Sequence, residues 1–302
     1  MKPLLHAMRP RQWTKNLLVF AGLIFSARFT DRESVTLAML TFAAFCLVAS
    51  AGYLLNDVLD RDSDRQHPEK RQRPVASGAL SPAAATIAAV VLLALGVTVG
   101  AMANTVALLA LAAYALNQAF YVLIGRAIAL VDVFVIASGF LIRAVAGAAV
   151  LGVFISPWLL LCTLMLALFL GFSKRRHELA LESNSRSALS GYSIGVIDQF
   201  IGITAAGTVL SYSLYAVQSE TAAEHPLLYL TIPFPVFGVF RYLQLVHTEG
   251  DGGNPDATLL TDPWIAGTVL GWIAASRRFV DEGEASGISD RSIDDILAAA
   301  RK

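Results

Sequence analysis

The chain has 302 residues, of which 56% are hydrophobic and only 15% are charged. A soluble protein carries about 25% charged residues, so this composition excludes an ordinary soluble domain and indicates an all-α, polytopic protein embedded in a lipid bilayer. The net charge is zero, which gives no support for binding to nucleic acid. The two cysteines, Cys46 and Cys162, both fall in apolar segments, where free cysteine behaves as a small core residue rather than as half of a disulfide or metal pair.

Apolar segments of the length that crosses a bilayer, about 17 to 25 residues, recur along the chain. We predict about nine transmembrane spans, at residues 12–26, 34–55, 82–103, 105–124, 130–151, 157–172, 194–218, 226–246 and 263–276. The first is the weakest, because Lys15 and Asn16 interrupt it. We therefore expect a membrane helix bundle that forms one domain over residues 1–280, followed by a polar tail over residues 281–302.

Lys and Arg residues are unevenly divided between the two sets of loops. Most lie in the N-terminal segment, in the loops after the second, fourth and sixth spans, and near the end of the eighth, whereas three loops of the other set contain none. The positive-inside rule places the basic loops in the cytoplasm. The N-terminus lacks a short apolar region with a small-residue cleavage site, so no signal peptide is expected.

The loop after the second span carries a dense acidic motif. Asn56, Asp60 and Asp64 are successive i,i+4 positions, with Asp57 beside them, so a continuing helix would place these oxygen ligands on one face at the membrane edge. Carboxylates this close together need a cation, and hard oxygen ligands suit Mg²⁺. These four residues are therefore a predicted metal site. The alternative is a solvated loop whose acidic residues merely balance its basic ones.

Basic residues follow this motif. Pro68 is expected to end the helix, since a proline pushes the residue before it out of the α region. Lys70, Arg71 and Arg73 come next, and a Mg²⁺ site beside a basic run indicates a phosphate or diphosphate ligand.

The loop after the sixth span holds a second basic run. Lys174 and Arg175 lie one helical turn before Glu178, which could present paired cations at the membrane surface. Alternatively, they act only as topology signals. The equivalent placement of the two loops, four spans apart, hints at two related halves.

Arg143 is the only cation deep within a predicted span, and Asp132 lies three turns before it on the same face. A cation inside the membrane is costly and is a candidate functional residue by default. The alternative is a structural role, with a buried carboxylate or carbonyl as partner. Lys15, beside Trp13, is either a substrate ligand or an interfacial anchor. The sequence contains no GxSxG, HExxH, CxxC or P-loop motif, so catalysis would depend on a metal, fixed positive charge and positioning.

The acidic motif Asn56-Asp57-x-x-Asp60-x-x-x-Asp64 resembles the first motif of the UbiA superfamily of intramembrane prenyltransferases. That resemblance implies nine helices around a central cavity. Further similar elements are Tyr121 with a basic residue, Arg126, five positions on, and Asp132 followed by GFLIRAVAG.

The chain departs from most members of that superfamily after the sixth span. A second Asp-rich motif is usual there, whereas this chain has the basic Lys174-Arg-Arg-His-Glu178-Leu. Together with RPRQWTKN and DRxHPxKRxRPxASG, this string is similar to the decaprenyl-phosphate phosphoribosyltransferase branch.

The resemblance implies a pentosyltransferase of the bacterial inner (cytoplasmic) membrane, with its active site facing the cytoplasm. It would use Mg²⁺ to transfer a 5-phosphoribosyl group from phosphoribosyl pyrophosphate to a polyprenyl (decaprenyl) phosphate, releasing pyrophosphate, in cell-wall arabinan precursor synthesis. Asp57, Asp60 and Asp64 would be catalytic. The implied substrate-binding residues are Lys15, Tyr53, Lys70, Arg71, Arg73, Tyr121, Arg126, Arg143, Lys174, Arg175, Glu178 and Arg186.

Other interpretations of the sequence stay open. One is a UbiA-type prenyltransferase that moves an isoprenoid from its diphosphate to an aromatic or other acceptor. Another is a transporter or lipid-binding scaffold without catalysis, which would have to explain the acidic motif without Mg²⁺. The sequence also leaves open whether the protein is a monomer or a homo-oligomer.

Overall fold

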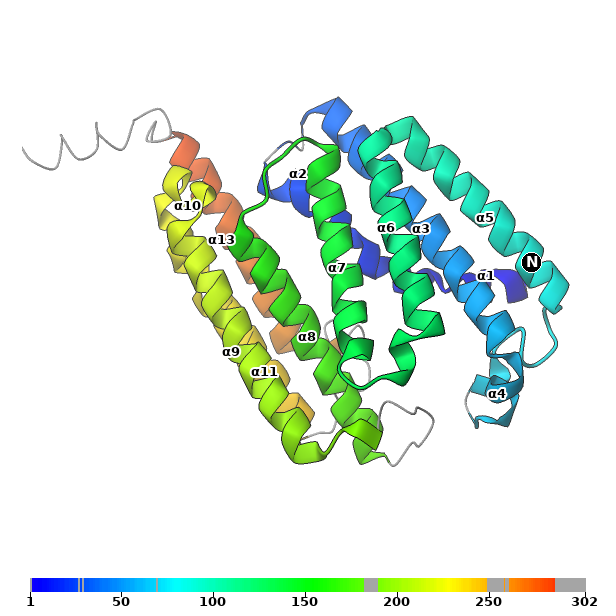
Figure 1. Ribbon diagram of the computed structural model, residues 1–302. Coiled ribbons are helices and arrows are strands. Elements are labelled where there is room, and N and C mark those ends of the chain that lie inside the picture. The colour runs from blue at the N-terminus through cyan, green and yellow to red at the C-terminus, as the bar shows by residue number, and fades with distance from the viewer. Residues whose placement is uncertain are drawn as a thin grey trace, which may run out of the picture. The chain divides into compact units, whose positions relative to one another are not determined.

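The computed structural model describes residues 2–26, 28, 30–68, 70–181, 190–248, 258 and 261–285. These residues form helices joined by turns, and none of them belongs to a strand, which confirms the predicted all-α fold (Figure 1). The chain divides into two compact units. The first is Met1–Ile155 with Ser185–Gly191, and the second is Ser156–Asn184 with Tyr192–Lys302.

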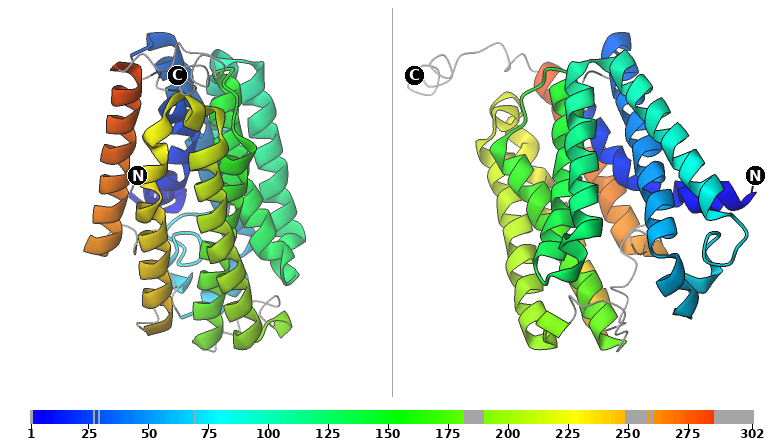
Figure 2. Two further views of the ribbon diagram at one scale, coloured as in Figure 1. Left: turned by 90° about the vertical axis from the view of Figure 1, so that its left-hand side faces the viewer. Right: turned by 45° about the vertical axis from the view of Figure 1, so that its right-hand side comes forward.

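The first unit contains the N-terminal segment and four long helices. Its elements are α1 (Lys2–Met8), the 3-10 helix η1 (Pro10–Phe20), α2 (Ala21–Phe25), α3 (Arg32–Leu59), α4 (Arg61–Gln66), η2 (Lys70–Gln72), α5 (Pro82–Ala103), α6 (Thr105–Leu123), η3 (Gly125–Ala127) and α7 (Val131–Val150). Helix α3 packs along α5, and α6 packs along α7 (Figures 1 and 2). Side-chain caps fix the starts of three of these helices: Asp31 for α3, Ser81 for α5 and Asn104 for α6.

The N-terminal segment packs directly on the backbone of α7. A Cβ atom added at Gly147 would lie 1.9 Å from the carbonyl oxygen of Val19, and one added at Gly22 would lie 2.6 Å from Ala148 Cα. Small residues at such crossings let two backbones approach closely within a membrane bundle. The segment is therefore held against α7 by shape, and Asn16 is carried into the interior of the unit, where it is buried.

The second unit contains α8 (Pro157–Ala180), α9 (Ile194–Gln218), α10 (Glu220–Glu224), η5 (Pro226–Thr231), α11 (Pro233–Thr248) and α13 (Pro263–Ala285). Helices α8 and α9 pack together, as do α11 and α13. Asp262 accepts hydrogen bonds from Nε and Nη2 of Arg241 on α11, and it caps the start of α13 by accepting from Ile265 N. The hydrogen bond from Arg241 is the main reason that the pKa of Asp262 lies below its ordinary value.

Seven helices of the described chain are long and apolar enough to cross a membrane, compared with about nine predicted spans. They cover Arg32–Leu59, Pro82–Ala103, Thr105–Ala127, Val131–Val150, Pro157–Ala180, Ile194–Gln218 and Pro226–Thr248. The first and ninth predicted spans are also helical, but neither is among these seven helices. Residues 12–26 form a 3-10 helix and a short α-helix, and Asn16 in this segment is buried. Helix α13 runs beyond residue 276 into a charged stretch.

Candidate functional site

The acidic motif spans a bend between two helices. Helix α3 ends at Leu59 and α4 begins at Arg61, with Asp60 between them at φ −91° and ψ 5°. The i,i+4 backbone hydrogen bonds nevertheless continue, from Asp60 N to Asn56 O at 2.9 Å and from Asp64 N to Asp60 O at 2.8 Å. Helix α4 ends at Gln66, and His67 is extended before the proline, as predicted. The motif is therefore nearly continuous helix, bent at its central carboxylate.

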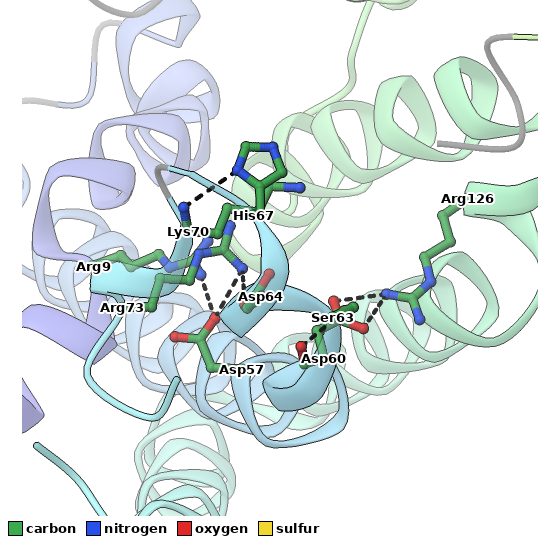
Figure 3. A network of polar contacts seen from close by, with 9 residues as sticks. All are labelled: Arg9, Asp57, Asp60, Ser63, Asp64, His67, Lys70, Arg73 and Arg126. Carbon is green, nitrogen blue, oxygen red and sulfur yellow. Dashed lines mark hydrogen bonds and ion pairs between the residues drawn. The ribbon is translucent and has the colours of Figure 1, made fainter. Parts of the chain in front are cut away.

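Asp57 and Asp64 are both buried, and both contact the same arginine (Figure 3). Arg73 Nη1 lies 2.7 Å from Asp64 Oδ2 and 3.5 Å from Asp57 Oδ1. Arg9 Nη2 donates a second hydrogen bond to Asp57 Oδ1 at 2.5 Å. Two carboxylates from different helices thus converge on one cationic nitrogen.

Asp60 turns in another direction. Both of its carboxylate oxygens lie 2.8 Å from Nη1 of Arg126, which is on η3 between α6 and α7. Figure 3 shows this pair apart from the contacts of Asp57 and Asp64 with Arg9 and Arg73. The bend after Leu59 explains the divergence, because the predicted single face requires a straight helix through all the motif residues. Asn56 remains on the last turn of α3, with its side chain partly exposed.

The convergence of Asp57 and Asp64 fits a divalent cation such as Mg²⁺. Carboxylate oxygens are its preferred ligands, and Mg²⁺ usually binds through one or two carboxylates together with waters and substrate phosphates. A complete cage is not preformed: among the described residues, no group of three or more His, Cys, Asp or Glu side chains could hold a metal ion. The protein would therefore supply two carboxylates, and a ligand or solvent would complete the coordination.

The loop after α4 brings Arg73 to the two carboxylates. Arg65 on α4 donates from Nε to Ala76 O at 2.9 Å, and Leu80 N donates to Pro74 O at 2.9 Å. Gly78 has φ +83°, a conformation that favours glycine. Lys70 and Arg71 lie earlier in this loop on η2, where Lys70 N donates to His67 Nδ1.

The N-terminal segment follows one face of α3 and pairs with its polar residues. Arg9, in the left-handed region at φ 53°, places its guanidinium 5.0 Å from the centre of the Tyr53 ring while it binds Asp57. Trp13 Nε1 donates to Ser50 Oγ at 3.0 Å. One turn deeper, Asn16 Nδ2 donates to Cys46 Sγ at 3.2 Å. We did not predict Arg9 as a site residue, although it is the first residue of the RPRQWTKN motif. The helix η1 begins at the next residue, Pro10.

Arg143 lies at the inner end of this path and is buried. Its Nε donates to Asn16 Oδ1 at 2.6 Å, its Nη1 to Gly139 O at 2.6 Å and its Nη2 to Tyr114 OH at 2.8 Å. The guanidinium also lies over the Tyr114 ring, 4.5 Å from its centre. All these partners are neutral, so the contacts described for this buried cation include no carboxylate. Sequence reasoning identified Arg143 but missed Asn16 and Tyr114.

Other predicted residues of the first unit lie near these contacts in the chain. Lys15 is on η1, next to the buried Asn16, and its own side chain is partly exposed. Tyr121 lies in the last turn of α6, ahead of Arg126. Asp132 is buried in the first turn of α7.

The second unit holds the basic run of α8. Arg175 is buried and forms an ion pair with Glu178, and Arg176 Nε donates to Asp198 Oδ1 at 2.6 Å. Lys174 is partly exposed on the same helix. Arg186 lies outside the described residues.

Comparison with known proteins identifies the family to which the chain belongs. Residues 17–182 match the UbiA prenyltransferase family. A solved UbiA homolog from Archaeoglobus fulgidus bound to GPP and Mg²⁺ superposes with a TM-score of 0.73 at 19% identity, covering 92% of this chain and 99% of that one. The protein belongs to the UbiA prenyltransferase family and is a transferase embedded in a membrane.

Within this family, the chain is similar to enzymes of one particular kind. The decaprenyl-phosphate phosphoribosyltransferase of Corynebacterium glutamicum is 33% identical over 282 residues, covering 89% of this chain and 84% of the relative. The enzyme of that name from Mycobacterium tuberculosis is 34% identical over 280 residues, covering 89% of this chain and 91% of the relative. The predicted family and branch resemblance are thereby confirmed.

Proposed function

We propose that this protein transfers a 5-phosphoribosyl group from phosphoribosyl pyrophosphate to a polyprenyl phosphate such as decaprenyl phosphate, releasing pyrophosphate. The observation that carries the proposal is the similarity to phosphoribosyltransferases of that name over 89% of this chain. The reaction would belong to cell-wall arabinan precursor synthesis. It would take place at the cytoplasmic face of a bacterial inner membrane, where the positive-inside rule puts the acidic motif.

The acidic motif would bind the pyrophosphate of the donor. Asp57 and Asp64 would hold Mg²⁺, which neutralises the charge that develops on the departing pyrophosphate. Arg9 and Arg73 contact these carboxylates, so their guanidinium groups lie beside the proposed metal site and would bind phosphate oxygens. Lys70 and Arg71 follow on η2 and would add further charge-assisted contacts to phosphate.

The donor also carries a 5-phosphate, remote from the reacting carbon. We assign this group to the basic run of α8, because fixed cations are a natural partner for phosphate. Lys174 is partly exposed there, and Glu178 holds Arg175 in place through an ion pair. Arg186 is part of the same proposal.

The acceptor needs little activation. A phosphate monoester has a second pKa of about 6, so at neutral pH it is already an anionic nucleophile and requires no general base. Lys15 and Arg143 are the candidates for holding it. Arg143 is the stronger of the two, since its described partners are neutral and its positive charge is not balanced by them.

Purified protein in detergent micelles tests the proposal directly. It would be incubated with polyprenyl phosphate or an aromatic acceptor, with or without Mg²⁺, and with either labelled phosphoribosyl pyrophosphate or labelled geranyl diphosphate. We expect label in the lipid product only from phosphoribosyl pyrophosphate and only with Mg²⁺. Transfer from geranyl diphosphate to an aromatic acceptor, with none from phosphoribosyl pyrophosphate, would instead establish the prenyltransferase alternative.

A further inference from the structure

The buried carboxylates of the acidic motif already have cations of their own. Asp57 and Asp64 face Arg9 and Arg73 at 2.5 to 3.5 Å. Arginine stays protonated in proteins, so two negative and two positive charges balance one another within this cluster. The motif is therefore locally neutral before any metal is added.

Both arginines are tethered near the carboxylates by other parts of the chain. Arg9 lies over the Tyr53 ring. Arg73 belongs to a loop that is tied to α4 by the hydrogen bond from Arg65 to Ala76 O. Neither cation can simply diffuse away when a metal ion arrives. A divalent ion that entered alone would leave this cluster with a net charge of about +2, and beside the buried carboxylates, where the effective dielectric is low, the repulsion between the ion and the two arginines is strong.

A diphosphate ligand would remove the repulsion between the metal ion and the two arginines. It carries several negative charges, and arginine binds phosphate oxygens well because its planar donors match them in pairs. The two arginines can then turn from the carboxylates to the diphosphate, which frees Asp57 and Asp64 for the metal. Charge balance thus favours a metal ion and a diphosphate together over either of them alone.

We propose that Arg9 and Arg73 are resident counter-cations that make metal binding at Asp57 and Asp64 conditional on a diphosphate ligand. This inference rests on one part of the proposed function, namely that the ligand is a diphosphate bound together with a metal ion. It does not depend on which group the diphosphate carries. The pair formed by Arg126 and Asp60 takes no part, because Arg126 contacts neither of the other carboxylates in the described structure.

Mn²⁺ binding to the purified full-length protein, followed by electron paramagnetic resonance, tests the inference without turnover. We expect inorganic pyrophosphate to raise the Mn²⁺ affinity by about 5- to 150-fold, the usual range for coupled sites. In Arg9→Gln and Arg73→Gln, Mn²⁺ should bind more tightly without pyrophosphate than it does to the wild type, and pyrophosphate should add less.

Three further variants make the result specific. Arg11→Gln removes an equal charge from η1, two residues after Arg9, but the Arg11 side chain is exposed, so the coupling should persist. Arg73→Lys keeps the charge and should retain part of the coupling even if the Gln variant folds poorly. Asp64→Asn should lose Mn²⁺ binding in the presence of pyrophosphate.

Equal Mn²⁺ affinity with and without pyrophosphate in the wild type would overturn the inference, as would weaker binding of Mn²⁺ alone to both Gln variants. Neither result would touch the donor assignment, which the transfer assay decides separately. Conversely, pyrophosphate-dependent Mn²⁺ binding in a protein that uses only geranyl diphosphate would sustain this inference and refute the phosphoribosyl donor.

Discussion

Arg126 holds both carboxylate oxygens of Asp60 at 2.8 Å and so draws this residue away from the rest of its own motif. The pair joins the bend after α3 to the turn between α6 and α7. Because the two side chains are 40% and 18% exposed, water screens their attraction. The pair therefore orients the motif more than it stabilises the fold.

A double-mutant cycle measures the link between Asp60 and Arg126. In the unfolding free energy we expect Asp60→Asn, Arg126→Gln and the double variant to show a coupling of only about 0.2–1 kcal/mol, as for other exposed ion pairs. Thermal or denaturant unfolding in detergent provides the values. Strict additivity of the two single changes would show that the contact is not formed in solution.

Asp57 and Asp64 should be far more sensitive to substitution than their neighbours. Loss of either carboxylate removes a metal ligand, and we expect kcat/KM to fall by about 10²–10³-fold, equivalent to several kcal/mol of lost transition-state stabilisation. Asp62→Asn is the matched control, because Asp62 lies on the same helix as Asp64 but its side chain is exposed. Activity near the wild-type value for both Asp57→Asn and Asp64→Asn would refute the metal assignment.

Close packing of the N-terminal segment on α7 gives a prediction about stability. An alanine methyl at Gly147 would overlap Val19 O at 1.9 Å, so Gly147→Ala should displace the segment and cost about 1–3 kcal/mol, as overpacking does elsewhere. Gly52→Ala is the control, since a Cβ there meets no described atom within 4 Å and alanine is the better helix former. Melting temperatures of the two variants should move in opposite directions. Equal shifts would contradict the contact.

The sequence was sufficient to predict the helical membrane fold and the acidic motif, because apolar length and i,i+4 spacing are local properties. It could not predict that the side chain of Asp60 would point away from that of Asp57, because this depends on the position of the turn that carries Arg126 in the folded protein. The contact between Arg9 and Asp57 was missed for a similar reason. The two residues are 48 positions apart in the chain. Arg9 immediately precedes the 3-10 helix η1, and hydropathy alone predicted a weak membrane span over most of that helix.

The orientation in the membrane can be tested at Ser63. This residue is exposed on α4, whereas the native Cys46 and Cys162 are both buried, so a Ser63→Cys variant would offer one reactive thiol. Because the basic loops are expected inside, a membrane-impermeant maleimide should label this cysteine in broken cells and not in intact ones. Labelling in intact cells would reverse the proposed topology.

Asn16 offers a way to separate a structural from a substrate-binding role for Arg143. Asn16→Asp would place a carboxylate where the amide oxygen now accepts from Arg143 Nε at 2.6 Å, so the buried positive charge would be balanced internally. If Arg143 attracts the acceptor phosphate, this variant should raise the KM for polyprenyl phosphate about tenfold or more, since a charge-assisted contact contributes about 1.5–3 kcal/mol. The KM for the donor should stay nearly unchanged.

Asn16→Ala is the companion variant, because it removes the same acceptor without adding charge. It should lower the stability by about 1–3 kcal/mol, the cost of leaving a buried donor unsatisfied, yet keep the acceptor KM closer to the wild-type value. Melting temperature and the two KM values, measured on both variants, distinguish the roles. If Asn16→Asp is as active as the wild type while Asn16→Ala is destabilised, Arg143 serves only to hold the N-terminal segment against α6 and α7.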